Sequence, residues 1–197
     1  DEFLMGDNSY NSRRSAMLWS MVIREWSLKY GDLISGWWVD GAYADQNPYE
    51  DILAMYVNAM KAGNPNAVVA LNPGIVIAER GELADYTAGE TDYPFGSDDL
   101  SLITNPDNWM TPEHNKVSED VQWFMLTFLD KGWCHNGGPR KQLYDKELWG
   151  QYVKTVLDQG GAICLDVKFT MGTGSDYTMY PEMYEILKEI QRQYYGS

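Results

Sequence analysis

The chain has 197 residues, long enough to bury one core without disulfide bonds, and its 44% hydrophobic and 22% charged residues are ordinary for a globular protein. That composition excludes disorder, collagen-like sequence and coiled coil, and no apolar run approaches the roughly 20 residues of a membrane span. Because 15 Lys and Arg stand against 29 Asp and Glu, the net charge of -14 would repel nucleic acid and anionic membranes, and we expect neither as a partner.

Helices and strands are predicted to alternate along the chain. Apolar residues at helical spacing, bounded by Gly, Pro or Asn, predict four helices over residues 15–30, 47–62, 143–159 and 181–195. Short apolar runs rich in strand formers predict buried strands over residues 33–39, 67–71 and 162–167. A further short strand is predicted over 84–90, and 121–129, apolar enough for a strand or a short helix, is taken as a strand. The long segment 91–108 is predicted to be a loop, and loops of this length in compact domains are often functional.

This alternation is typical of a parallel sheet covered by helices, which places the chain in the α/β class. About five strands are too few for a closed eight-stranded α/β barrel, which needs roughly 250 residues, although they are enough for most of one. No repeat, linker or low-complexity tract divides the chain.

The aromatic content is unusual, because 8 Trp and 14 Tyr stand against 5 Phe. Tyr and Trp combine an apolar ring with a polar group, which suits stacking on sugar rings, and they also fill protein cores. The composition therefore favours carbohydrate contact without requiring it.

Two features bear on the metal content and the completeness of the chain. Cys134 and Cys164 have neither metal-ligand spacing nor a disulfide framework, and we interpret Cys164 as a buried free thiol. The start, Asp1-Glu2-Phe3-Leu4, has no initiator Met and no signal sequence. We expect the chain to have been trimmed or to begin inside a larger protein.

Candidate catalytic residues lie where apolar strands end, because parallel α/β folds place their catalytic groups there. Asp40 follows such a strand and precedes Gly41, which marks Asp40 as a candidate nucleophile or base, or else as a carboxylate that caps the next turn. Asn72, segment 85–90 and Asp166 are the other strand ends.

Glu90, within segment 85–90, supplies a second carboxylate. Two carboxylates brought to one rim by neighbouring strands are what glycoside hydrolysis requires. A solvated loop charge is the alternative interpretation of Glu90.

Three segments resemble the α-L-fucosidases of glycoside hydrolase family 29, in the same order and with similar spacing. They are Gly36-Trp37-Trp38-Val39-Asp40-Gly41, Asp85-Tyr86-Thr87-Ala88-Gly89-Glu90 and Gly160-Gly161-Ala162-Ile163-Cys164-Leu165-Asp166-Val167. The first is similar to the strand end that carries the family's nucleophile, and the second to the segment that carries its acid/base Glu. The third resembles the final barrel strand, with Asp166 where Asn is usual.

The resemblance implies that residues 1–197 are the C-terminal portion of a single (β/α)8 barrel whose N-terminal strands are missing. It implies a retaining hydrolase of α-L-fucosides with Asp40 as nucleophile and Glu90 as acid/base, without metal or organic cofactor. It also implies a carbohydrate substrate and a secreted or periplasmic location. Another chain or segment would then complete the barrel. The expected sugar-contacting residues are Trp38, Tyr43, Asn72 and Trp133.

The sequence also departs from that family. The family's sugar pocket uses histidines from the first barrel strands, whereas this chain has only His114 and His135, neither in a matching context. Two alternatives therefore stay open: the same fold with another sugar specificity, and a non-catalytic carbohydrate-binding or scaffolding barrel.

Overall fold

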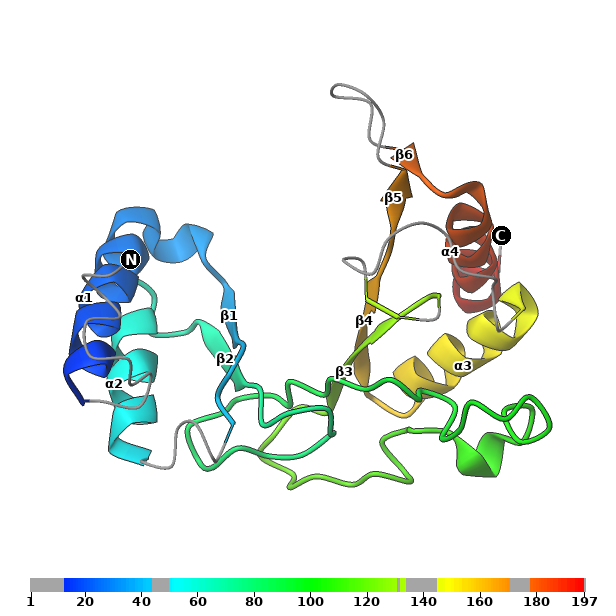
Figure 1. Cartoon of the computed structure of the whole chain (residues 1–197), viewed down its shortest axis with the longest axis horizontal. Coiled ribbons are helices and arrows are strands. Elements are labelled where there is room, and N and C mark those ends of the chain that lie inside the picture. The colour runs from blue at the N-terminus through cyan, green and yellow to red at the C-terminus, as the bar shows by residue number, and fades with distance from the viewer. Residues whose placement is uncertain (1–12, 44–49, 131, 134–144, 171–177, 197) are drawn as a thin grey trace. The chain divides into compact units, whose positions relative to one another are not determined.

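The computed structural model describes residues 13–43, 50–130, 132–133, 145–170 and 178–196. These residues belong to two compact units (Figure 1). The first unit is Asp1–Ala88 with Ser118–Gln122, and the second is Gly89–Val117 with Trp123–Ser197.

The first unit packs two helices on one face of a parallel strand pair. Its elements are α1 (Arg13–Tyr30), η1 (Gly31–Leu33), β1 (Gly36–Val39), α2 (Glu50–Met60) and β2 (Val68–Leu71). β1 pairs with β2 so that Trp37 is opposite Val69 and Val39 is opposite Leu71. These four side chains pack with apolar residues of α2 in one core, so they face the helices. Because side chains alternate along a strand, Trp38 lies on the opposite face.

A close backbone contact joins α1 to the end of α2. Ser27 Oγ donates to the Met60 carbonyl oxygen at 2.6 Å and accepts from the Gly63 N–H at 2.9 Å. A Cβ atom on Gly63 would lie 1.9 Å from the Ser27 carbonyl oxygen, so only glycine permits this approach.

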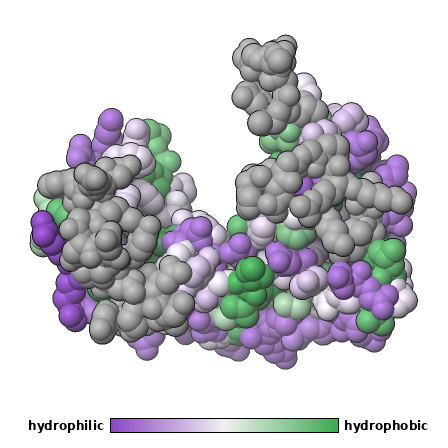
Figure 2. Space-filling view, viewed as in Figure 1, coloured by the Kyte–Doolittle hydropathy of each residue, from purple (hydrophilic) through white to green (hydrophobic). Residues whose placement is uncertain are grey.

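α1 and η1 carry exposed apolar side chains. Figure 2 shows hydrophobic surface over η1, where Leu33 is 86% exposed. On α1 the exposed apolar side chains are Met17, Trp19, Met21, Trp26, Leu28 and Tyr30. Within the described residues, no helix is both long enough and apolar enough to cross a membrane.

Asp85 extends the β1–β2 pair without forming a regular strand. Its N–H donates to the Val69 carbonyl oxygen at 2.8 Å, and its Oδ2 accepts from the Val69 N–H at 2.9 Å. The same oxygen accepts from Lys61 Nζ at 2.8 Å. The carboxylate thus replaces the carbonyl of a neighbouring strand, and beyond it Tyr86 forms a parallel bridge with Gln122.

The second unit also covers one face of a parallel pair with helices (Figure 1). Its elements are η2 (Pro106–Asn108), β3 (Phe124–Phe128), α3 (Lys146–Asp158), β4 (Ala162–Asp166), β5 (Phe169–Thr170), β6 (Thr178–Met179) and α4 (Pro181–Tyr195). β3 and β4 are parallel, with Leu126 opposite Cys164 and Phe128 opposite Asp166. The Tyr152 hydroxyl oxygen of α3 lies 3.1 Å from Met125 Sδ, so Met125 faces α3. Leu126 and Phe128 therefore face away from that helix.

An aromatic cluster anchors the long segment after Thr91 to α3. Phe95 and Trp109 from that segment pack edge-on or tilted against Trp149 and Tyr152, with ring centroids 4.9 to 5.9 Å apart. The Tyr152 hydroxyl donates to the Met110 carbonyl oxygen at 2.7 Å, and burial raises the pKa of Tyr152 well above 10.0. Here the aromatic richness serves a core, not a sugar-binding surface.

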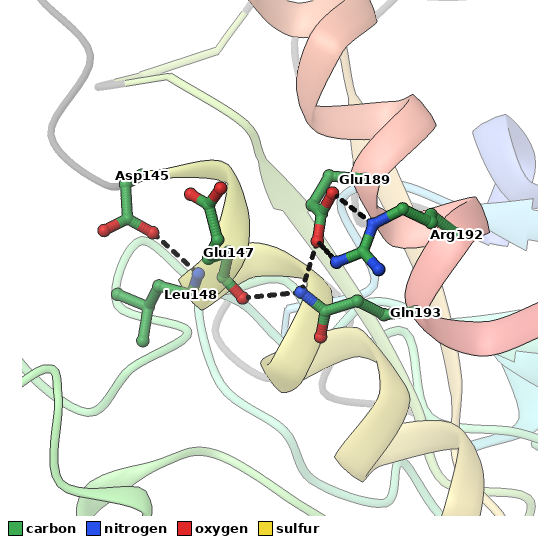
Figure 3. A network of polar contacts seen from close by, with 6 residues as sticks. All are labelled: Asp145, Glu147, Leu148, Glu189, Arg192 and Gln193. Carbon is green, nitrogen blue, oxygen red and sulfur yellow. Dashed lines mark hydrogen bonds and ion pairs between the residues drawn. The ribbon is translucent and has the colours of Figure 1, made fainter. Parts of the chain in front are cut away.

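A polar network joins α4 to α3 (Figure 3). Glu189, 8% exposed, accepts from Arg192 Nε at 2.8 Å and from Gln193 Nε2 at 2.7 Å. Gln193 Nε2 also donates to the Glu147 carbonyl oxygen of α3 at 3.2 Å. Chiefly through the hydrogen bonds from Arg192 and Gln193, the pKa of Glu189 falls from 4.5 to about 2.

The predicted elements are largely confirmed. The final helix, 181–195, and the strand within 121–129 form as expected. In the described residues α2 begins at Glu50, and its predicted start at Asn47 lies outside them. The expectation of buried strands is wrong for β1 and β4, neither of which has a buried residue. Among the described residues, each pairs with one other strand and is covered by helices on one face only. Cys164 is accordingly exposed, not buried.

Glu189 should make the free energy of unfolding depend on pH in the acid range. Because its folded-state pKa lies below 4.5, ionised Glu189 stabilises the fold above about pH 4.5, and this contribution is lost as the pH falls toward about 2. Glu189→Gln should therefore lower the melting temperature at neutral pH. Between about pH 4.5 and about pH 2, the melting temperature of the variant should fall less than that of the native protein. The matched control is Glu185→Gln, which removes only an exposed pair with Lys188. Equal acid slopes for both variants would contradict the assignment.

Candidate active site

Asp40 is held in place through one carboxylate oxygen. It follows β1 directly, and its Oδ1 accepts from the Gly41 N–H at 2.8 Å, from Asn72 Nδ2 at 3.2 Å and, more weakly, from the Tyr43 hydroxyl at 3.4 Å. Among the described residues, no contact to Oδ2 accompanies these three. The side chain itself is exposed. A fixed, accessible carboxylate at a strand end is suited to nucleophilic or base chemistry.

Asn72, at the carboxyl end of β2, is the buried member of this group. Its relative exposure is 0%, and its N–H donates to the Val39 carbonyl oxygen at 2.9 Å. The structure thus brings Asp40, Tyr43 and Asn72 together, three of the residues singled out from the sequence.

Trp38 lies on the same strand face as Asp40, two positions earlier. Its indole Nε1 donates to the Ala88 carbonyl oxygen at 3.3 Å, and the ring is half-buried. The polar end of the indole is therefore fixed, and part of the side chain is still accessible to solvent.

Glu90 belongs to the second unit and is positioned by β3. It forms a parallel bridge with Leu126, whose N–H donates to the Gly89 carbonyl oxygen at 3.0 Å and whose carbonyl oxygen accepts from Thr91 N–H at 3.0 Å. Bridge partners direct their side chains to the same face, so Glu90 shares the face of Leu126, away from α3. Instead of the continuous strand expected over 84–90, the pairing is interrupted at Gly89, whose φ of 60° is left-handed.

The carboxyl ends of β3 and β4 carry further candidate residues. Trp133 packs edge-on against Phe128 with ring centroids 5.1 Å apart, and Asp166 ends β4 on the same face as Phe128. Burial, and then the Asp166 carboxylate, raises the pKa of the Cys164 thiol, which favours its neutral form.

One charged pair beyond these strand ends was not predicted from the sequence. Lys168 Nζ lies 3.1 Å from Asp130 Oδ2, with side-chain exposures of 3% and 4%. Each residue follows a strand end by two positions, a signal that could have indicated it. Such a pair is costly to break, so it ties together the segments that leave β3 and β4.

His114 does not lie at this end of the strands. Its Nδ1 is 2.9 Å from the Trp109 carbonyl oxygen, and the neighbouring Glu113 N–H is bonded to Gln159, just before β4. His114 is thus at the amino ends of β3 and β4, while His135 lies outside the described residues. Within the described ranges, no group of three or more His, Cys, Asp or Glu residues is arranged to hold a metal ion.

Comparison with known proteins finds likeness in structure but not in sequence. No family model matches the chain, and no curated protein matches it. A variant of the endo-fucoidan hydrolase MfFcnA4, from glycoside hydrolase family 107, matches with a TM-score of 0.68 at 19% identity, over 98% of this chain and 32% of that chain. The endo-fucoidan hydrolase P5AFcnA of the same family matches with a TM-score of 0.67 at 16% identity, over 98% of this chain and 59% of that chain.

A third solved chain is described as a "putative alpha-L-fucosidase from Bacteroides thetaiotaomicron". It matches with a TM-score of 0.61 at 12% identity, over 98% of this chain and 41% of that chain. The chain therefore shares the fold of part of several glycoside hydrolases, and it spans about a third to three fifths of their length.

Gly89 should be essential for placing Glu90. A Cβ atom there would lie 1.9 Å from the Phe124 carbonyl oxygen, and its φ of 60° disfavours any other residue. Gly89→Ala should lower the free energy of unfolding by about 2 to 5 kcal/mol, combining left-handed strain with overpacking. Gly160→Ala is the control, because Gly160 has a similar φ of 80° with nothing within 4 Å of the added Cβ. Denaturant unfolding showing equal losses for the two variants would contradict the close approach to β3.

Proposed function

We propose that the protein is a retaining glycoside hydrolase acting on α-L-fucosides, with Asp40 as nucleophile and Glu90 as acid/base. The observation that carries the proposal is the Asp40 carboxylate, exposed at the end of β1 and held through Oδ1 by Gly41, Asn72 and Tyr43. The fold shared with fucose-related hydrolases and the family 29 resemblance of segments 36–41 and 85–90 both support it.

In the proposed mechanism Asp40 attacks the anomeric carbon and forms an ester bond with it as the glycosidic C–O bond breaks. Glu90 donates its proton to the departing oxygen. The resulting Glu90 carboxylate then takes a proton from water, whose oxygen attacks the same carbon and releases the sugar and the Asp40 carboxylate. No metal ion or organic cofactor is required for either step.

The mechanism predicts a definite distance. Retaining enzymes place their two carboxyl groups about 5 to 5.5 Å apart, whereas inverting enzymes leave roughly 6.5 to 9.5 Å for a water molecule. The retaining mechanism proposed here therefore requires the shorter spacing between the Asp40 and Glu90 carboxyl groups in the full-length protein bound to a sugar. Trp38, Tyr43 and Trp133 are the proposed sugar contacts.

We further propose that the chain is the C-terminal part of a (β/α)8 barrel completed by another segment or chain. Among the described residues, β1 pairs only with β2, and β4 only with β3. Val68 and Cys164, on the faces of these pairs away from the helices, are exposed, as are several apolar side chains of α1, and neighbouring strands and helices of a complete barrel would cover them. A secreted or periplasmic location is proposed on the family resemblance alone.

A fucose polymer is the second candidate substrate, because two of the solved relatives are named as endo-fucoidan hydrolases. The full-length protein should be assayed with an aryl α-L-fucoside and with fucoidan. Release of the aryl group supports a fucosidase, and new reducing ends from fucoidan alone support an endo-acting polymer hydrolase. Binding of these sugars without turnover would favour the non-catalytic alternative.

Asp40→Gly should separate catalysis from folding. In the full-length enzyme it should reduce turnover by several orders of magnitude, and azide should restore part of the activity by occupying the vacated space as an external nucleophile. Asp120→Gly, at an exposed turn of the same unit, is the control and should keep its activity. Undiminished turnover by Asp40→Gly would exclude Asp40 as the nucleophile.

A further inference from the structure

The hydrogen bonds of Asp40 distinguish its two carboxylate oxygens. All three donors in the described residues reach Oδ1, from the Gly41 backbone, the Tyr43 hydroxyl and the Asn72 amide. A carboxylate fixed through one oxygen presents the other in a constant direction. The strand face carrying Trp38 and Asp40 is also the face away from α2, and the Asp40 side chain is exposed there.

Asn72 is the donor whose orientation is itself determined. Its Oδ1 accepts from the Gly74 N–H at 3.0 Å, and a backbone N–H can be met only by the amide oxygen. The amide nitrogen must therefore face Asp40. Because Asn72 has no solvent exposure, water does not compete for its amide group.

We infer that Asn72 is a positioning residue for Asp40, not a sugar contact, and that it makes Oδ2 the oxygen that attacks the anomeric carbon. The inference rests on the proposed function, in which Asp40 is the nucleophile. Donation from Asn72 to Oδ1 stabilises the ionised carboxylate and prevents its rotation, so Oδ2 is presented to the substrate ready for attack.

The tests are Asn72→Ala and Asn72→Asp in the full-length protein. Asn72→Ala removes the donor and should lower kcat about 100-fold while KM changes little, since a misplaced nucleophile slows the chemical step more than it weakens binding. Asn72→Asp keeps an acceptor for the Gly74 N–H but sets a second carboxylate beside Asp40. Two adjacent carboxylates cannot both ionise easily, so the acid limb of the pH–rate profile should move upward by about one unit or more.

A direct readout does not depend on activity. In a crystal structure of Asn72→Ala, the Asp40 carboxylate should have lost the orientation that the hydrogen bond from Asn72 gives it. Asn58→Ala and Asn58→Asp are the controls, because Asn58 is exposed on α2 of the same unit, and they should alter neither this orientation nor kcat. If Asn72→Ala fails to fold, the nearly isosteric Asn72→Asp still decides the question.

The outcomes separate the two proposals. A raised KM with unchanged kcat would make Asn72 a sugar contact and overturn the inference, as would an Asp40 carboxylate that keeps its native orientation in Asn72→Ala. Full activity of Asp40→Gly would instead overturn the proposed function. A displaced Asp40 carboxylate with lost kcat in the Asn72 variants, and an inactive Asp40→Gly, would support both.

Discussion

The arrangement of the candidate site follows from one constraint: helices cover a single face of each parallel strand pair. Side chains alternate along a strand, so every residue that packs against a helix sends its neighbour to the other face. Trp37 and Val39 join the core beneath α2, and Trp38 and Asp40 must then face away from it. A shift of one residue would exchange the two sets and bury the Asp40 carboxylate in an apolar core. The alternation of side chains that builds the core of the first unit thus also leaves the Asp40 carboxylate exposed.

Asp40 is accessible and yet fixed because its partners come from rigid parts of the unit. Gly41 is the adjoining backbone, and Asn72 ends the paired strand, with its amide orientation determined by Gly74. Glu90 is fixed differently, by backbone pairing with Leu126 and by the close approach that Gly89 allows. Catalytic groups held by strand ends rather than by long loops need little reorganisation before reaction.

Local patterns predicted most helices and strands and the neighbourhood of Asp40 and Asn72, because periodicity and strand ends are properties of short segments. They could not predict that Asp85 would substitute for a strand carbonyl, since this depends on Val69, which is distant in sequence. The strand-end positions of Asp130 and Lys168 could have indicated each residue, but not that the two would pair. The burial of Trp109 and Trp149 likewise depends on contacts with Phe95, so aromatic content alone could not distinguish a core from a sugar-binding surface.

The central claim is that Asp40 bonds covalently to the sugar during turnover. It is tested most directly by incubating the full-length protein with a fluorinated fucosyl donor, which forms a glycosyl-enzyme that hydrolyses slowly, and then mapping the labelled peptide by mass spectrometry. The account predicts one added fucosyl group, on the peptide containing Asp40 and specifically on its carboxylate. A label on Glu90 or Asp166 instead would contradict it.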